Sequence, residues 1–381
     1  MRISDVETHV LGDNWRNIVF VRVLTDEGLY GIGEATIQNR DEAVVAYIQA
    51  AKNRHIVGSD PFNIEDLWMR MYRDDFWRGG PVANTALSAV EIACWDIVGK
   101  ALDTPVYRLL GGQCHERLKA YANGWYTGDR TPEDFARRAK TVVAKGYRAL
   151  KVDPFGAGTY EMEAEEKRKS IALVEAIRDA VGPDVEIFIE MHGRFSPATA
   201  IEIARELEPF NPGWVEEPVP PEDQDALERA ARDIHVPVAT GERIFTRYEY
   251  ARFFARNVVD IVQPDIIHAG GIMELKKIAA MADAHYVMVA PHCSNGPVCT
   301  AASVHFDFCT TNVKVQECFD DFAPDFVREA VIGFPRVKDG YFSPPEAPGL
   351  GIDLNLDVIK EHPYRFGHFN LFADDWQRRA Y

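Results

Sequence analysis

Residues 185–217, VEIFIEMHGRFSPATAIEIARELEPFNPGWVEE, decide the fold of this chain. The segment opens with VEIFIE and closes with WVEE, two short runs that are rich in β-branched and aromatic residues and end in carboxylates. Such runs are typical of buried strands, and the residues between them show a helical pattern. The segment therefore predicts one strand–helix–strand unit.

The same unit recurs on both sides of this segment. Candidate strands lie at 118–124, 147–153, 185–190, 214–217, 237–240, 259–263, 286–290 and 313–318, with a helical pattern between each pair. The clearest helix follows the first strand, because Thr131 is a good N-cap, Pro132 suits the first helical position and Gly146 ends the pattern. Eight strands joined by helical crossovers predict a (β/α)-barrel of the α/β class. A doubly wound open sheet would need a glycine-rich phosphate-binding fingerprint, and the chain has none.

The first 115 residues show a different order of elements. Residues 17–36 predict a strand, a TDEG turn and a second strand, while 41–52 and 84–102 predict helices, the second one capped by Asn84. Strands followed by helices are the order of an α+β domain. The expected organisation is a capping domain at 1–115, a catalytic barrel at 116–339, and a segment at 340–381 that returns to complete the capping domain.

Composition limits the classes of partner and compartment. The chain carries 59 acidic and 42 basic residues, and its net charge of −17 disfavours nucleic acid and anionic membranes as partners, because both require basic surfaces. Six cysteines without a CxxC pair indicate free thiols in a reducing compartment. The N-terminal residues, MRISDVETHVLGDNW, lack an apolar signal core, and no run of about 18 apolar residues occurs. We therefore expect a cytoplasmic protein.

Three carboxylates occupy equivalent places on consecutive strands. Glu190, Glu216 and Glu242 follow strand ends at intervals of 26 residues, and the catalytic side chains of barrel enzymes lie at the C-terminal ends of strands. Carboxylates brought together there repel one another by roughly 4 kcal/mol per pair at 4 Å and an effective dielectric constant of 20. A divalent cation removes that cost, and oxygen ligands suit Mg²⁺, with Mn²⁺ as an alternative. Any one of the three taken alone is equally well explained as a solvated surface carboxylate.

Polar residues on other strand ends extend this pattern. His292 follows the seventh strand and Asp265 follows the sixth, so the carboxylate can orient the imidazole and raise its basicity. His192 lies two residues past Glu190, and Lys151 ends the second strand. A lone histidine is more often structural, whereas a histidine beside a proposed metal ligand favours a functional role. Lys151 is a candidate charge partner, a base with a shifted pKa, or a structural ion pair.

These motifs also carry a resemblance to a known family, the mandelate racemase group of the enolase superfamily. The similarity runs nearly end to end, and it rests on the segments WDIVGKAL, EEP, GER, QPD, APHC and PGLGI. The segments YANGWY, ALKVDPFG and EMHGRF are most similar to those of the galactonate and gluconate dehydratases. The resemblance implies a modified TIM barrel of the (β/α)7β type under a capping domain.

The resemblance also implies roles for particular residues. It assigns Mg²⁺ binding to the three carboxylates Glu190, Glu216 and Glu242. It assigns the general base to His292 with Asp265, and the general acid of the dehydratases to His192. Lys151 matches the first lysine of a Lys-x-Lys pair on the second strand, and Glu317 matches a carboxylate that hydrogen-bonds the substrate carboxylate or its enediolate.

Two positions depart from the pattern of the family. Many relatives have aspartate as the first metal ligand, where this chain has the longer Glu190. The second lysine of the pair is replaced by Asp153, which removes a base of the racemase kind and disfavours a two-base racemase. The resemblance therefore implies dehydration of an aldonic acid such as gluconate or galactonate. His292 would take the C2 proton to form an enediolate, and His192 on the opposite strand would protonate the departing 3-hydroxyl, giving a 2-keto-3-deoxy acid.

Other functions stay open at this point. A racemase, epimerase or cycloisomerase of the same superfamily would keep the metal and release no water. A metallohydrolase barrel is disfavoured because no HxH pair occurs among the 11 histidines, and a non-catalytic interaction protein would not need the three carboxylates. The resemblance implies a small-molecule sugar-acid substrate and a homo-oligomer. We expect loops near 11–18 and 74–83 to select the sugar acid, because loops carry specificity.

Overall fold

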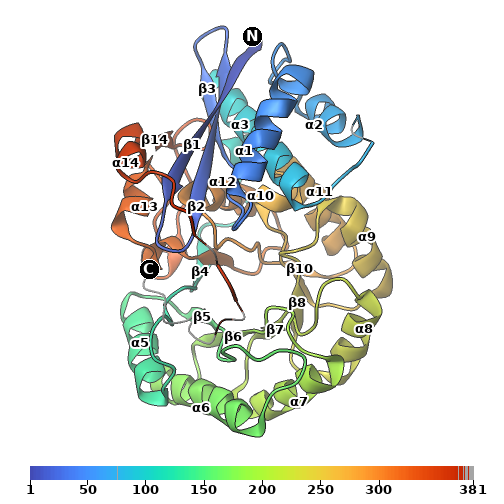
Figure 1. The fold of residues 1–381 in the computed structure, drawn as a ribbon, viewed down its shortest axis with the longest axis vertical. Helices are drawn as coiled ribbons and strands as arrows, with labels where there is room; N and C mark the ends of the chain where they lie inside the picture. The colour runs from blue at the N-terminus through green and yellow to red at the C-terminus, as the bar shows by residue number, and fades with distance from the viewer. Residues whose placement is uncertain (75, 368, 372, 374–375, 377–381) are drawn as a thin grey trace.

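The N-terminal part of the chain is a three-stranded antiparallel sheet packed against helices (Figure 1). The computed structural model describes residues 1–381 except 75, 368, 372, 374–375 and 377–381. The strands are β1 (Ile3–Gly12), β2 (Asn17–Thr25) and β3 (Tyr30–Glu34), and the helices are α1 (Asp41–Ala51), the π-helical turn η1 (Lys52–Ile56), α2 (Ile64–Arg73), α3 (Pro81–Ala101) and α4 (Val106–Leu109). The predicted strands within 17–36 and the helix at 41–52 are confirmed. Strand β1 and helix α2 lie outside the predicted elements, although α2 buries Ile64, Leu67, Trp68 and Met71 at helical spacing.

Helix α3 is the central helix of this part, and it begins three residues before its predicted start. Pro81 occupies the first turn after Gly80, because proline has a helical φ and needs no hydrogen-bond partner there. The prediction of Asn84 as the N-cap is wrong, and Asn84 is buried inside the helix. Among the described residues α3 is the one helix long and apolar enough to cross a membrane, and 83% of its apolar stretch is buried inside the protein.

Eight parallel strands form the barrel that the sequence predicts. They are β4 (Leu118–Ala122), β5 (Ala149–Val152), β6 (Glu186–Glu190), β7 (Trp214–Glu216), β8 (Val238–Thr240), β9 (Ile261–Val262), β10 (Met288–Val289) and β11 (Gln316–Cys318). They are hydrogen-bonded in the order β11-β4-β5-β6-β7-β8-β9-β10, and a parallel bridge between Val289 and Val313 completes the ring. Strand β10 is shorter than predicted, because Tyr286 lies in a turn with a φ of 58° and is 97% exposed.

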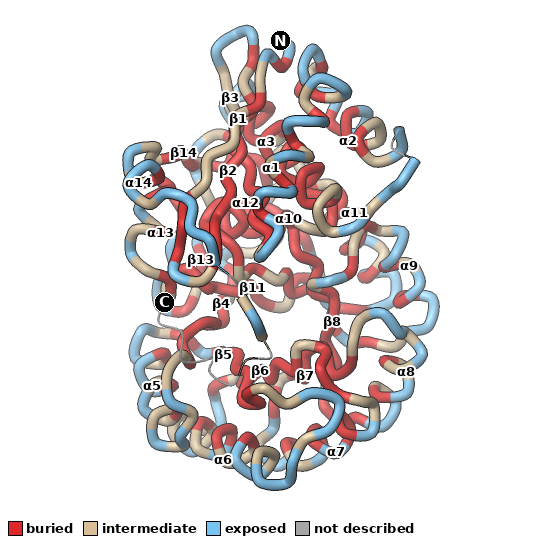
Figure 2. Tube along the Cα trace, viewed as in Figure 1, coloured by how far each residue is buried: buried red, intermediate tan, exposed pale blue. Residues whose placement is uncertain are grey.

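Helices surround the strands on the outside of the barrel (Figure 1). They are α5 (Pro132–Ala144), α6 (Ala164–Val181), α7 (Pro197–Leu207) with the 3₁₀ turn η2 (Glu208–Phe210), α8 (Gln224–Asp233), α9 (Thr246–Arg256), α10 (Ile266–Ala269), α11 (Ile272–Asp283) and α12 (Pro297–Phe308). The predicted cap of α5 is confirmed, since the Thr131 side chain accepts a hydrogen bond from the Asp134 amide. Figure 2 shows the strands buried and the outer faces of these helices largely exposed.

The C-terminal part of the chain contacts both the barrel and the N-terminal sheet. Its elements are η3 (Asp320–Phe322), α13 (Asp325–Glu329), β12 (Val331–Ile332), β13 (Tyr341–Phe342), β14 (Asp353–Leu354) and α14 (Leu356–Glu361). Strand β13 pairs with β4 of the barrel, and β12 pairs with β14. Beyond α14 the chain returns to the sheet, where the Gly12 amide donates to the His362 carbonyl and the Arg365 amide donates to Asn17 Oδ1. The domain boundaries at 115/116 and 339/340 stay a prediction.

One apolar layer inside the barrel positions the polar residues above it. Each strand or its edge contributes one side chain to this layer, which consists of Tyr121, Ala149, Phe188, Trp214, Ala239, Ile261, Ala290 and Val315. Because alternate residues of a strand point to the same side, the residue two positions later also points into the barrel. Those positions hold Asn123, Lys151, Glu190, Glu216, Gly241, Gln263, His292 and Glu317. Strand periodicity thus places a polar ring on an apolar floor.

Candidate active site

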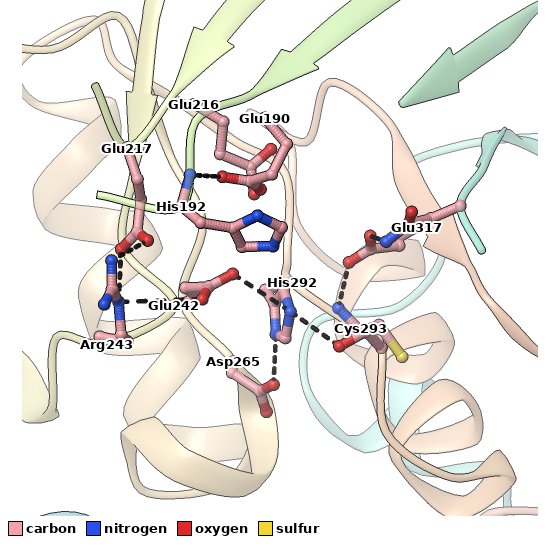
Figure 3. Close-up of polar contacts among 12 residues, drawn as sticks. Glu190, His192, Glu216, Glu217, Glu242, Arg243, Asp265, His292, Cys293 and Glu317 are labelled. Atoms are coloured by element: carbon pink, nitrogen blue, oxygen red, sulfur yellow. Dashed lines mark hydrogen bonds and ion pairs between the residues drawn. The ribbon is translucent and has the colours of Figure 1, made fainter. Parts of the chain in front are cut away.

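Three carboxylates converge at the C-terminal ends of β6, β7 and β8 (Figure 3). Glu190 and Glu216 are direct partners in the parallel ladder between β6 and β7, and Glu242 follows β8 by two residues. One oxygen atom from each carboxylate lies within 4.8 Å of the others. The structure therefore brings together the three residues that the sequence selects as metal ligands.

Lys151 is the cation that the protein itself supplies to this cluster. Its Nζ lies 2.8 Å from Glu216 Oε1, 3.0 Å from Glu317 Oε1 and 3.4 Å from Glu190 Oε2. Burial by itself lowers the pKa of Lys151, but the charges of Glu216 and Glu317 outweigh burial and raise that pKa well above its usual range. Lys151 therefore stays protonated, which favours a charge partner over a base.

The single positive charge of Lys151 does not balance the negative charges of the carboxylates around it. The unbalanced negative charge falls on Glu190. Glu190 Oε2 is buried and accepts no hydrogen bond. Burial and the charge of Glu216 raise the pKa of Glu190 well above its usual range, which disfavours simultaneous ionisation of the carboxylates in the absence of a further cation. A cluster of hard oxygen donors with an unsatisfied charge fits Mg²⁺ or Mn²⁺.

Glu217, the next residue along the chain, is not part of this cluster. Its Oε1 accepts from Arg243 Nε at 3.2 Å and its Oε2 from Arg243 Nη2 at 2.5 Å (Figure 3). Glu217 has a φ of 43°, in the left-handed region that non-glycine residues rarely adopt. The chain thus turns sharply after β7, and the two adjacent glutamates take different partners.

His292 and Asp265 form a buried imidazole–carboxylate pair next to Glu242. His292 Nδ1 lies 2.6 Å from Asp265 Oδ2, and the Asn295 side chain donates to the same oxygen at 2.8 Å. The other ring nitrogen, Nε2, lies 3.0 Å from Ser294 Oγ and 3.3 Å from Glu242 Oε2. Burial lowers the pKa of His292, but Glu242 and the hydrogen bond to Asp265 together raise it to about 10.

His192 belongs to a second imidazole–carboxylate pair. Its Nδ1 lies 2.5 Å from Asp153 Oδ2, and its backbone amide donates to Glu190 Oε1 at 2.6 Å. His192 has a φ of 49°, a left-handed conformation that costs a non-glycine residue on the order of 1 kcal/mol. The local fold accepts this strain and places the ring between Glu190 and Glu216 on one side and Glu242 and His292 on the other (Figure 3).

Glu317 closes the polar ring on β11. Its Oε1 accepts from Asn123 Nδ2 at 2.8 Å as well as from Lys151, and its Oε2 accepts from the Cys293 amide at 2.6 Å. The residue is fully buried, and these contacts connect it to the segment that carries His292. The five residues selected from the sequence for catalysis thus surround the same space as the carboxylate cluster.

A cavity of about 680 Å³ opens above this ring. Its polar side includes Lys151, His192, Glu242 and His292, and its apolar side includes Trp15, Tyr126, Phe319, Phe369, Leu371 and Trp376. Trp15 and Pro81 come from the two loop segments, 11–18 and 74–83, that the sequence analysis names for specificity. The C-terminal aromatic residues lie outside the predicted site, since no local pattern marks them. Trp376 donates to the Gly156 carbonyl at 3.0 Å and meets the His192 ring edge-on, with centroids 6.1 Å apart.

The fold and this site together define a barrel enzyme with paired acid–base groups and a carboxylate cluster suited to a cation. Residues 6–111 match the profile of the mandelate racemase / muconate lactonizing enzyme N-terminal domain, and residues 134–358 match that of the enolase C-terminal domain-like family. The chain therefore belongs to the mandelate racemase / muconate lactonizing enzyme family of the enolase superfamily, as its motifs indicate.

Curated relatives and solved structures cover nearly the whole chain. D-galactonate dehydratase of Ralstonia pickettii (strain 12J) is 39% identical over 99% of this chain and 96% of its own length. D-gluconate/D-galactonate dehydratase of Picrophilus torridus is 39% identical over 94% of this chain and 92% of its own. The crystal structure of a mandelate racemase/muconate lactonizing enzyme from Jannaschia sp. CCS1 superimposes with a TM-score of 0.90 at 36% identity, covering 97% of this chain and 99% of that one.

Proposed function

We propose that this enzyme is a hydro-lyase that uses Mg²⁺ to dehydrate an aldonic acid, such as D-gluconate or D-galactonate, to a 2-keto-3-deoxy acid. The names of the full-length relatives support the reaction and the substrate class. The observation that carries the proposal is the presence of two imidazole–aspartate pairs in one cavity, above one carboxylate cluster. Such a site offers one group to remove a proton and another to donate one.

The carboxylates of Glu190, Glu216 and Glu242 would hold the cation. When bound, the cation supplies positive charge that stabilises the enediolate as the substrate loses its C2 proton. Lys151, buried and charged, adds a fixed positive charge 2.8 Å from Glu216 Oε1 and 3.0 Å from Glu317 Oε1. These groups bind the substrate carboxylate and orient C2 toward His292.

His292 removes the C2 proton in this mechanism. A cation held by Glu242 would offset the negative charge that raises the pKa of His292, which would leave Nε2 free to accept the proton. The electron pair of the broken C–H bond moves into the carboxylate to give the enediolate. Asp265 holds Nδ1 at 2.6 Å, which fixes the ring and stabilises the imidazolium that forms. The Asn295 side chain and the Ile267 amide hold Asp265 in turn.

His192 assists the departure of the 3-hydroxyl. The electron pair of the enediolate forms the C2=C3 bond as the C3–O bond breaks, and His192 Nε2 donates a proton so that water leaves instead of hydroxide. The enol product then tautomerises to the 2-keto-3-deoxy acid. Strands β6 and β10 lie four apart in the ring of eight, so the two histidines approach the substrate from opposite sides, which suits anti elimination.

The alternative, a racemase or epimerase, requires a second base at C2. The strand-two position for that base holds Asp153, which pairs with Arg194 and His192. The test is proton NMR in D₂O of aldonic acids with enzyme and Mg²⁺, and the expected product is a 2-keto-3-deoxy acid. A C2 epimer that accumulates without keto acid would assign the site to the alternative reaction. The cytoplasmic location and the homo-oligomer stay predictions, and light scattering tests the second.

A further inference from the structure

Asp153 is a buried carboxylate to which the proposed mechanism assigns no step of its own. It follows β5, its side chain is inaccessible to solvent, and both of its oxygens accept hydrogen bonds. Arg194 Nη2 lies 2.6 and 2.7 Å from the two oxygens, and the Phe155 amide donates to Oδ1 at 2.9 Å. The contact that faces the cavity is the one between Oδ2 and His192 Nδ1, at 2.5 Å.

The Asp153–His192 pair repeats the design of the Asp265–His292 pair. In each pair the aspartate follows one strand and the histidine follows the next, β5 and β6 in one case and β9 and β10 in the other. In each pair the carboxylate holds Nδ1, at 2.5 or 2.6 Å. The ring nitrogen left for a substrate is therefore Nε2 in both histidines.

We infer that Asp153 is a positioning residue for His192, holding Nδ1 so that Nε2 alone is presented to the leaving 3-hydroxyl. The inference rests on the proposed dehydration and adds a residue to it. Without the carboxylate, the ring is free to rotate about its side-chain bonds and to offer either nitrogen. The left-handed backbone at His192 and the ion pair of Asp153 with Arg194 give the ring one orientation.

The substitution Asp153→Asn tests this role with almost no change in shape. Arg194 and the Phe155 amide both donate to Oδ1, so they favour the amide oxygen of asparagine there. The NH₂ group then takes the place of Oδ2, where it faces His192 Nδ1 and loses the second contact with Arg194. His192 Nδ1 then faces a donor in place of the carboxylate oxygen, so the ring loses the contact that holds Nε2 toward the leaving hydroxyl. We expect kcat for dehydration to fall about 100-fold, the usual scale of a general acid, with KM changed less than about threefold. Exchange of the C2 proton in D₂O should stay within about twofold, because it depends on His292.

Two further measurements separate positioning from a structural role. The double variant Asp153→Asn/His192→Ala should dehydrate no more slowly than His192→Ala alone, because residues that act as a unit are not additive. A 3-deoxy-3-fluoro aldonate loses fluoride without needing a proton, so the defect of Asp153→Asn should shrink to about tenfold or less on that substrate. Additive losses, or an equal loss of exchange and dehydration, would overturn the inference.

Asp96 provides a matched control. Asp96 is equally buried and lies on α3, away from the cavity. Its carboxylate accepts hydrogen bonds from Lys100 of the same helix and from the backbone amides of Ile32 and Leu350. Asp96→Asn should lower C2 proton exchange and dehydration by the same factor, because it reduces only the fraction of protein that is folded.

A readout independent of activity separates this inference from the proposed function. In protein labelled with ¹⁵N-histidine, the His192 signals, assigned by their loss in His192→Ala, should show that Nδ1 carries a proton in the wild type, whether or not Nε2 carries one as well. In Asp153→Asn they should show Nδ1 without a proton. If the wild type dehydrates no aldonic acid, the proposed function fails, and this spectrum still decides whether Asp153 sets the tautomer. Unchanged His192 signals in Asp153→Asn would refute the inference.

Discussion

Replacing Glu190 by glutamine tests the negative charge that the cluster offers to a cation, because among the described residues Glu190 Oε2 accepts no hydrogen bond and its ion pair with Lys151 is long, at 3.4 Å. Two unit charges 4.8 Å apart interact by roughly 3 kcal/mol at an effective dielectric constant of 20. Burial and the charge of Glu216 already favour the protonated, neutral form of Glu190 in the metal-free protein, so the metal-free variant should melt close to the temperature of the wild type. In the variant, Mg²⁺ loses its attraction to the Glu190 carboxylate, which is at least as large as this interaction of roughly 3 kcal/mol, so the Kd for Mg²⁺ should rise by more than about 100-fold.

Thermal unfolding with and without Mg²⁺ measures both effects. At a concentration of 100 times the wild-type Kd, the cation stabilises the folded protein by about 2.7 kcal/mol. An unfolding entropy of about 2.1 cal/mol/K per residue gives roughly 0.8 kcal/mol/K for 381 residues, so the wild-type Tm should rise by about 3 °C. In Glu190→Gln the same concentration falls below or near the new Kd, and the rise should be less than about 1 °C.

The neighbouring glutamate is the control for this experiment. Glu217 is also buried, but it pairs with Arg243 and lies outside the cluster. Glu217→Gln should lower the starting Tm, because the buried Glu217 side chain loses its ion pair with the more exposed Arg243, and it should keep the Mg²⁺-dependent rise of about 3 °C. A full Mg²⁺-dependent rise in Glu190→Gln would refute the reasoning that these carboxylates form the cation site.

The remaining predictions concern proton transfer and the apolar wall. His292→Asn should abolish C2 proton exchange in D₂O, and unchanged exchange would point to another base. His192→Ala should keep exchange and reduce dehydration about 100-fold or more, whereas loss of both in a folded, metal-binding protein would contradict separate roles. Since burial and the charge of Glu216 raise the pKa of Glu190, binding of Mg²⁺ to this carboxylate competes with its protonation. Apparent Mg²⁺ affinity should therefore increase with pH. Titration calorimetry in two buffers of different ionisation enthalpy should detect the release of a proton on binding. Equal binding heats in the two buffers would argue against proton release. Trp376→Ala should raise KM more than it lowers kcat, because it removes part of the cavity wall and no reacting group. A lower kcat with unchanged KM would contradict the assignment of Trp376 to substrate binding.

Local periodicity was sufficient to predict the barrel and the convergence of its carboxylates. Buried strands at regular intervals determine the ring, and the two-residue repeat of a strand places Glu190 and Glu216 above Phe188 and Trp214. The same reasoning misplaced element boundaries, as at Asn84, because one favourable capping residue competes with a proline three positions earlier. Motifs near strand ends were likewise sufficient to select His192, His292 and Lys151.

The sequence by itself determined the fold class, the family and the chemical types of the residues at the strand ends. Only the tertiary structure decided which of these residues pair, as Asp153 does with His192 and Glu217 with Arg243, and that Lys151 is a fixed charge. It also decided that Trp376 lies against the site, 220 residues from the Gly156 carbonyl that it contacts. The physical reason is range: strand and helix patterns arise from neighbours along the chain, whereas hydrogen-bond partners and pKa shifts depend on distances of a few ångströms and on burial, which exist only after distant segments have packed together.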